Sequence, residues 1–163
     1  MKFMKLLRQS PYSARIGCLM VLINVAAALF APIMTPYGET EVAGDVWEGP
    51  SARHWLGTDN LGRDLFTRVV YGARNTISLA FITTLLSFLI GTATGFIAAT
   101  LKGWTDLTIS RIVDILMAFP TLIFALMVLS VVGTSVAALI VVIALLDATR
   151  VFRLSRAVAM DIE

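Results

Sequence analysis

The sequence ILMAFPTLIFALMVLSVVGTSVAALIVVIALL, residues 115–146, contains no charged residue and decides the fold. One helix over this stretch would be about 48 Å long, too long for a single crossing of a hydrocarbon core of about 30 Å. Two full crossings of about 20 residues each would need more residues than the stretch holds. Gly133-Thr134-Ser135, near its middle, is typical of a tight turn. We therefore expect two helices, over residues 107–132 and from 135 to 152 or beyond, with charged residues inside both.

Two further uncharged segments precede this stretch. Residues 16–34 would form a helix of about 28 Å, the length of one crossing. A cleaved signal peptide is the alternative, but its apolar region is normally about 7–15 residues and therefore shorter. Residues 75–101 are long enough to cross the bilayer with some tilt. Both segments are therefore expected to be membrane helices.

Together these segments predict an all-α protein, a polytopic transmembrane helix bundle with about four membrane helices. We expect residues 1–36 to be a cytoplasmic N-terminus and first transmembrane helix, and residues 37–74 a periplasmic loop with an interfacial helix. Residues 75–163 would be the transmembrane core, ending in a cytoplasmic helix extension. With four crossings, nine of the 13 Lys and Arg residues fall on the side of the two termini. Because cytoplasmic loops carry the excess of Lys and Arg, this side is expected to be the cytoplasm.

The composition excludes several classes of function. Hydrophobic residues make up 58% of the chain and charged residues only 15%, with a net charge of +2. The basic residues are dispersed among apolar segments, so nucleic acid is a poor candidate partner, whereas membrane lipid is expected. The chain has one cysteine, Cys18, and one histidine, His54, which argues against an internal disulfide and a metal site. Because no phosphate-binding, zinc-protease or serine-hydrolase motif is present, we expect no catalytic, cofactor-binding or metal site and no enzyme activity.

Residues 75–101 carry small side chains at intervals of four. Residues four apart lie on one face of a helix, and such a face lets a second helix approach closely in lipid. We therefore expect this face to pack against another helix, although glycines are also common in membrane helices without such a role. The candidate packing residues, which continue from Thr83, are Ser87, Gly91, Gly95 and Ala99.

The two helices expected around residues 115–146 carry charged residues near their ends. Arg111 and Asp114 are three apart and can pair, and Asp147 and Arg150 repeat this spacing. Two interpretations stay open: pairing that holds the helices together, and a direct role in gating or transport. Pro120 should kink its helix, because it removes one intrahelical hydrogen bond. The candidate residues of this core are Arg111, Asp114, Pro120, Asp147, Arg150 and Arg153.

The most distinctive string is LGTDNLGRDLFTRVVYGAR, residues 56–74. Its glycines permit turns, Asp59 or Asn60 could cap a following helix, and Asp64 and Arg68 are spaced to pair. An ordinary amphipathic helix at the membrane surface is the alternative. The candidate residues of this motif are Leu56, Gly57, Thr58, Asp59, Gly62, Arg63, Asp64, Arg68, Gly72 and Arg74.

The order of these motifs resembles a known family. LGTD-x-x-GRD-x-x-x-R-x-x-YGAR, a Gly-rich span, D-x-x-x-x-R-x-x-D-x-x-x-x-x-P, G-T-S and an R-x-x-R helix are similar to the permease subunits of ATP-binding-cassette importers for dipeptides, oligopeptides and nickel. The resemblance implies a six-helix permease fold in the cell inner membrane, of which this chain would be the N-terminal part. It also implies a second permease subunit, cytoplasmic ATP-binding subunits that use the ATP, and a periplasmic solute-binding protein. Residues 56–74 would be periplasmic, and the helices bearing Arg111, Asp114 and Pro120 would belong to the translocation core.

Two departures from the family pattern change these expectations. The loop Leu101-Lys102-Gly103-Trp104 lacks the usual Tyr and paired glycines, which we interpret as loop variation. The family's coupling segment, with its Glu-Ala-Ala, would begin beyond Glu163, and the sequence stops within a helical pattern. We therefore expect a truncated chain that does not couple ATP hydrolysis to transport. The alternative function is a non-transporting membrane scaffold that only associates with partner helices, and the solute stays open among dipeptides, longer peptides and nickel.

Overall fold

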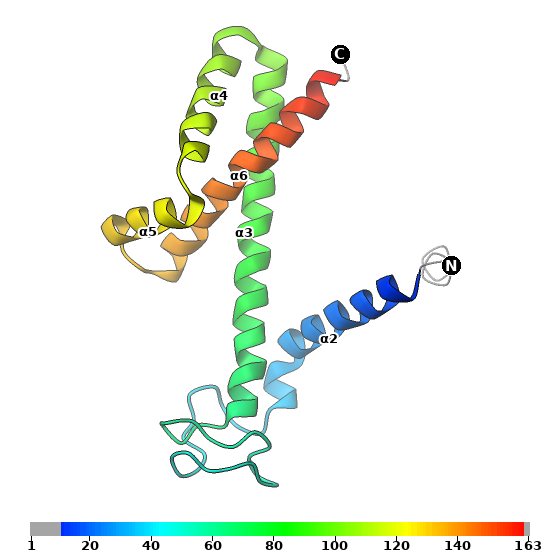
Figure 1. The fold of residues 1–163 in the computed structure, drawn as a ribbon, viewed down its shortest axis with the longest axis vertical. Helices are drawn as coiled ribbons and strands as arrows, with labels where there is room; N and C mark the ends of the chain where they lie inside the picture. Colours follow the sequence, from blue (N-terminus) through cyan, green and yellow to red (C-terminus); the bar gives the residue numbers. More distant parts are fainter. Residues whose placement is uncertain (1–10, 162–163) are drawn as a thin grey trace. The chain divides into compact units, whose positions relative to one another are not determined.

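The structure is a computed structural model, which describes residues 11–161. Its helices are α2 (Tyr12–Met34), α3 (Leu65–Leu101), α4 (Gly103–Ala118), α5 (Thr121–Val132) and α6 (Val136–Asp161) (Figure 1). The chain forms two compact units, which divide within α3 between Ser78 and Leu79. The orientation prediction used Lys2, Lys5 and Arg8, which lie outside the described residues, as does Glu163.

Helix α2 corresponds to the first predicted span. Most of its large apolar side chains are exposed, as expected for a helix that faces lipid. At its C-terminal end, the backbone N–H and the hydroxyl of Thr35 both donate to the carbonyl of Ala31. Pro36 follows and cannot continue the helix, so the chain leaves α2 at this point.

Helix α3 is longer than the sequence predicted. It has 37 residues and begins at Leu65, so the expected interfacial helix and the second span form one helix. A lone glycine costs an exposed helix only about 1 kcal/mol and does not end it, and Gly72 is the only Pro or Gly between Leu65 and Ile90. The separate interfacial helix was therefore the wrong interpretation of residues 65–74.

The membrane-helix class is confirmed. Helices α2 and α3 are each long and apolar enough to cross a bilayer, and α4 with α5 could count as one bent third span. Helix α6 does not qualify by the same test of length, hydropathy and charge, since its second half carries several charged residues. Two or three helices thus meet the requirement among residues 11–161, where the sequence predicted about four.

The helix expected over residues 107–132 is broken at Phe119-Pro120. Helices α4 and α5 meet there at 95°, which is more than the expected kink. Pro120 cannot donate a backbone hydrogen bond, and it holds the preceding Phe119 in an extended conformation with φ −94° and ψ 142°. Figure 1 shows α5 beside α6 after this break.

Helices α5 and α6 form a hairpin around a small apolar core. The turn between them contains Gly133, whose φ of 101° is one that other residues rarely adopt. The predicted turn at 133–135 is therefore confirmed. The core of the hairpin consists of the buried residues Ala125, Leu129, Val142 and Leu146.

Candidate functional site

Two glycines let the outer segment, residues 35–64, fold closely against itself. Gly57 has φ 80° and Gly62 has φ 72°. A Cβ atom at either position would lie 2.3 Å from a backbone oxygen, that of Glu48 or of Gly44 respectively. Only glycine fits such positions, so the segment from Gly44 to Gly62 depends on both.

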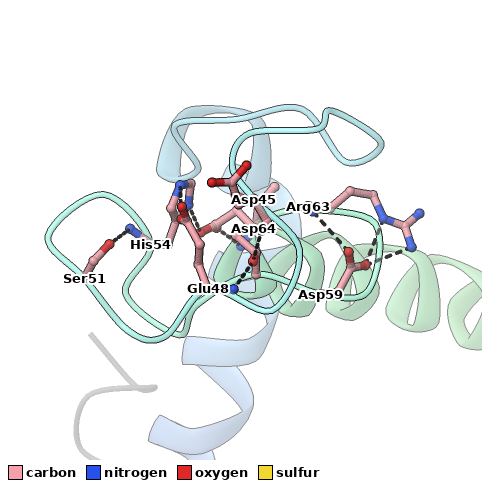
Figure 2. Close-up of polar contacts among 9 residues, drawn as sticks. Asp45, Glu48, Ser51, His54, Asp59, Arg63 and Asp64 are labelled. Carbon is pink, nitrogen blue, oxygen red and sulfur yellow. Dashed lines mark hydrogen bonds and ion pairs between the residues drawn. The ribbon is translucent and has the colours of Figure 1, made fainter.

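Asp59 holds the motif turn together. Its Oδ1 accepts hydrogen bonds from the backbone N–H groups of Leu61 (2.8 Å) and Arg63 (3.0 Å). Its Oδ2 accepts from Nε of Arg63 (2.9 Å) and from Nη1 of Arg68 (2.7 Å). Figure 2 shows Asp59 and Arg63 side by side at the start of α3. Burial by itself raises the pKa of Asp59, but these four hydrogen bonds outweigh it and hold the pKa well below its ordinary value.

Asp64 caps helix α3 and binds a buried histidine. Its Oδ2 accepts from the backbone N–H of Thr67 at 2.8 Å, and its Oδ1 lies 3.1 Å from Nδ1 of His54. The second ring nitrogen of His54 lies 3.7 Å from Oε2 of Glu48 (Figure 2). Burial by itself raises the pKa of Asp64, but the hydrogen bonds from Thr67 and His54 outweigh it and lower the pKa below 3.8.

This geometry corrects two predictions about the motif. The cap of the helix is Asp64, not Asp59 or Asn60, because the helix begins only at Leu65. Arg68 pairs with Asp59 rather than with Asp64, whose carboxylate is already bound by His54 and Thr67. Thr58 is buried, and its hydroxyl donates to the carbonyl of Asp45 at 2.6 Å. The other motif residues, Leu56, Gly72 and Arg74, are exposed.

Sequence reasoning missed His54 and Glu48. His54 is only 3% exposed and stacks on Tyr37, with ring centroids 5.3 Å apart. Its position directly before the motif, as the one histidine of the chain, was the available signal. Within residues 11–161 no group of three or more His, Cys, Asp or Glu side chains is arranged to hold a metal ion.

In the second unit, the small-residue face of α3 lies against α6. Ser87, Gly91, Gly95 and Ala99 are all buried, whereas most of their neighbours along α3 are exposed. A Cβ atom on Gly91 would lie 2.6 Å from the carbonyl oxygen of Ala148. One on Gly95 would lie 2.9 Å from Cβ of Ser155. The absence of side chains at these two positions therefore sets how closely α6 approaches α3.

Two ion pairs join α4 to α6 in the same unit. Nη2 of Arg153 lies 2.7 Å from Oδ1 of Asp114. Arg156 donates two hydrogen bonds to the two oxygens of Asp106, one of them 2.6 Å long. A cavity of about 360 Å³ opens beside these pairs and is lined by Ser110, Asp114, Phe152, Arg153 and Arg156.

These contacts correct the predicted pairing in the core. Among the described residues no ion pair joins Arg111 to Asp114, whose partner is Arg153 on another helix. Asp147 and Arg150 do face each other, but at 3.9 Å and with exposed side chains. Sequence reasoning missed Asp106 and Arg156, because they are 50 positions apart and only the packing of α4 on α6 brings them together.

The pair of Asp106 and Arg156 gives a direct test of this packing. We expect Asp106→Arg and Arg156→Asp each to lower the unfolding free energy of the helical core by about 1 kcal/mol, since the pair is partly exposed but doubly hydrogen-bonded. The double variant should recover most of the loss, because it restores the attraction with the charges exchanged. Unfolding in mixed detergent micelles measures this free energy for the two single variants and the double variant.

The matched control for this swap is Arg150→Gln. Its pair with Asp147 is long and exposed, so its loss should change stability by less than about 0.5 kcal/mol. Equal losses for Arg150→Gln and Arg156→Asp, or no recovery in the double variant, would contradict the assigned contact.

Comparison with known proteins finds a transport family and several transport permeases that are similar to this chain. Residues 91–162 match the family described as binding-protein-dependent transport system inner membrane component. The chain is 38% identical over 145 residues to the dipeptide transport system permease protein DppC of Alkalihalophilus pseudofirmus, covering 88% of this chain and 47% of that protein. It is 38% identical over 140 residues to the glutathione transport system permease protein GsiD of Pectobacterium atrosepticum, covering 85% and 46%.

A third relative, the DppC protein of Haemophilus influenzae, is 34% identical over 155 residues, covering 91% of this chain and 52% of that protein. The chain thus spans about half the length of the curated relatives it matches. The matched region includes the broken helix pair and α6, and the aligned relatives cover most of the sequence. The resemblance seen in the motifs is confirmed: residues 91–162 match this family of inner membrane components, and most of the chain is similar to permease proteins of dipeptide and glutathione transport systems.

Proposed function

We propose that this chain is a permease subunit of an ATP-driven importer and forms part of the path for peptides or a related small solute. The observation that carries the proposal is the agreement between the ordered motifs and relatives that are named as dipeptide and glutathione permeases. Relatives from both substrate groups are equally identical to this chain, so the solute is proposed only as a small peptide.

The geometry supports this proposal in two places. The motif of residues 56–64 builds a hydrogen-bonded segment that caps α3 through Asp64. The break at Pro120 separates α4, which carries charged residues, from the apolar α5. Irregular backbone within membrane proteins normally lines a cavity or is buried in protein. Such a break between two helices of a core suits a permease that alternates between two states.

The proposal includes partners and orientation. A second permease subunit would complete the path, cytoplasmic ATP-binding subunits would hydrolyse ATP, and a periplasmic solute-binding protein would deliver the solute. The N-terminus would lie in the cytoplasm of a cell with an inner membrane, and residues 37–64 would face the periplasm. These assignments rest on the family and on the distribution of Lys and Arg.

The alternative, a scaffold that binds partners through the small face of α3, has less support. Gly91 and Gly95 lie against α6 of the same chain, so this face is not free for another helix. The function favoured by the relatives therefore remains the leading proposal.

Uptake of a labelled dipeptide tests the proposed function. We expect deletion of the native gene to remove ATP-dependent accumulation, and the native gene supplied in trans to restore it. A gene in which Gly91 is replaced by leucine should fail to restore uptake, whereas one with Gly17→Ala should succeed, since no atom lies within 4 Å of a Cβ there. Unchanged accumulation in the deletion strain would refute a role in import. Sequencing the gene and its transcript through codon 163 and onward separately tests whether the reading frame continues into a Glu-Ala-Ala coupling segment.

A further inference from the structure

A cavity of about 260 Å³ lies between the outer segment and the first turn of α3. Its walls include three aromatic residues, Tyr37 and Trp55 from the outer segment and Phe66 from the first turn of α3. The rings of Trp55 and Phe66 contact each other at 5.0 Å between centroids, and Tyr37 is held by its stacking on His54. Ring contacts therefore hold all three aromatic side chains of the cavity wall.

One cation lies at this cavity, the guanidinium of Arg53. Arg53 is exposed, and among the described residues it forms no hydrogen bond or ion pair. It also lines a second, more polar cavity of about 360 Å³ together with Glu48, Ser51 and His54. Arg53 therefore stands where an apolar cavity meets a polar one, with its hydrogen-bond donors unused.

The carboxylate of Asp64 also borders the aromatic cavity, but it would repel an anion bound there only weakly. Asp64 is 3% exposed, and its two oxygens are bound by His54 and by the backbone N–H of Thr67. The accessible charge at the cavity is consequently that of Arg53. A cationic ligand would lie next to this unpaired arginine, so aromatic walls alone do not favour one.

We propose that the cavity of Tyr37, Arg53, Trp55 and Phe66 binds the C-terminal end of a short peptide, with an apolar side chain against the rings and the carboxylate on Arg53. Arginine binds carboxylates with two parallel hydrogen bonds, which an unpaired guanidinium can supply. The volume lies just below the range of drug-sized pockets, roughly 300–1,000 Å³, so it accommodates one side chain and its terminal carboxylate.

This inference rests on the proposed function only for the presence of peptides at this face. Binding itself needs no ATP and no partner, so it can be measured on the purified chain in lipid nanodiscs. Loss of uptake in the genetic test would therefore leave the binding result intact, and absence of binding would leave the uptake result intact.

The test uses glycyl-phenylalanine and its C-terminal amide as probes. In a Trp47→Phe, Trp104→Phe background, the fluorescence of Trp55 alone reports the cavity. We expect the peptide to change this fluorescence saturably and the amide to bind about tenfold more weakly, since it lacks the charge that pairs with Arg53. In Arg53→Gln, the peptide and its amide should bind with equal affinity, which should match that of the amide for the background protein.

Arg74→Gln is the matched control, because Arg74 is an exposed arginine of the same unit that does not line the cavity. It should keep the tenfold preference for the peptide. No saturable change with glycyl-phenylalanine, equal binding of peptide and amide, or a preference that survives Arg53→Gln would each overturn the inference.

Discussion

Replacement of Gly91 by alanine is expected to lower the unfolding free energy of the helical core by about 2–3 kcal/mol. The new Cβ would lie 2.6 Å from the carbonyl oxygen of Ala148 and 2.6 Å from Cβ of Val151, so α3 and α6 would have to separate. A backbone oxygen cannot move aside as the end of a flexible side chain can. Unfolding in mixed detergent micelles, followed by circular dichroism, measures the loss.

Two other glycines of α3 make this prediction specific. Gly95→Ala should cost less than Gly91→Ala, because its nearest contacts are longer, 2.9 Å to Ser155 and 3.0 Å to Phe152. Gly72→Ala should be neutral or stabilising by about 0.5–1 kcal/mol, since no atom lies within 4 Å and alanine favours the helix. A loss at Gly72 equal to that at Gly91 would show that close packing is not the cause.

Among replacements in the outer segment, Asp64→Ala is expected to cause the largest loss of local stability. It removes the cap of α3 and leaves the buried ring of His54 without its 3.1 Å partner. A cap contributes about 1 kcal/mol, and a hydrogen bond to a charged group about 1.5–3 kcal/mol, so we expect a local loss of roughly 2–4 kcal/mol. Hydrogen exchange measured by mass spectrometry should show faster exchange in residues 48–68.

The matched control is Asp45→Ala. Asp45 is an exposed carboxylate of the same segment, and among the described residues its side chain forms no hydrogen bond or ion pair. Its loss should leave exchange in residues 48–68 unchanged. Exchange in Asp64→Ala that matches the wild type would contradict the assigned role of the cap.

Acid should weaken the same segment in the wild-type protein. The pKa of Asp64 is lowered below its ordinary value of 3.8, so its stabilisation is fully present above pH 3.8 and is lost as the pH falls through the lower, folded-state pKa. The lowered pKa of Asp59 acts in the same direction. As the pH falls below 3.8, residues 48–68 should therefore lose less protection against hydrogen exchange in Asp64→Ala than in the wild type.

The outer motif illustrates what local sequence signals can predict. The requirement for glycine at positions 57 and 62 was predictable, because turns with positive φ exclude other residues. The partners of Asp59 and Asp64 were not, since helical spacing suggested Arg68 for Asp64. The actual start of the helix, at Leu65, moved Arg68 toward Asp59 and left Asp64 to cap the helix.

The sequence by itself determined the class of this protein. In lipid, an uncharged segment of bilayer length satisfies its backbone hydrogen-bonding groups within itself by forming a helix. Pro120 and Gly133 act on their own backbone, whatever packs around them. These properties are local, and they predicted the membrane helices, a kink at Pro120 and the turn at Gly133, although the kink proved to be a break of 95°. The order of the motifs along the chain likewise indicated the permease family.

Only the tertiary structure decided which charges meet. Asp106 with Arg156 and Asp114 with Arg153 join residues that are 50 and 39 positions apart. His54 meets Asp64 because two glycines allow a backbone path that no periodicity reveals. A charge can be placed on a helix face from spacing, but its partner depends on where a second helix packs, and the small residues Gly91 and Gly95 set that position on α3.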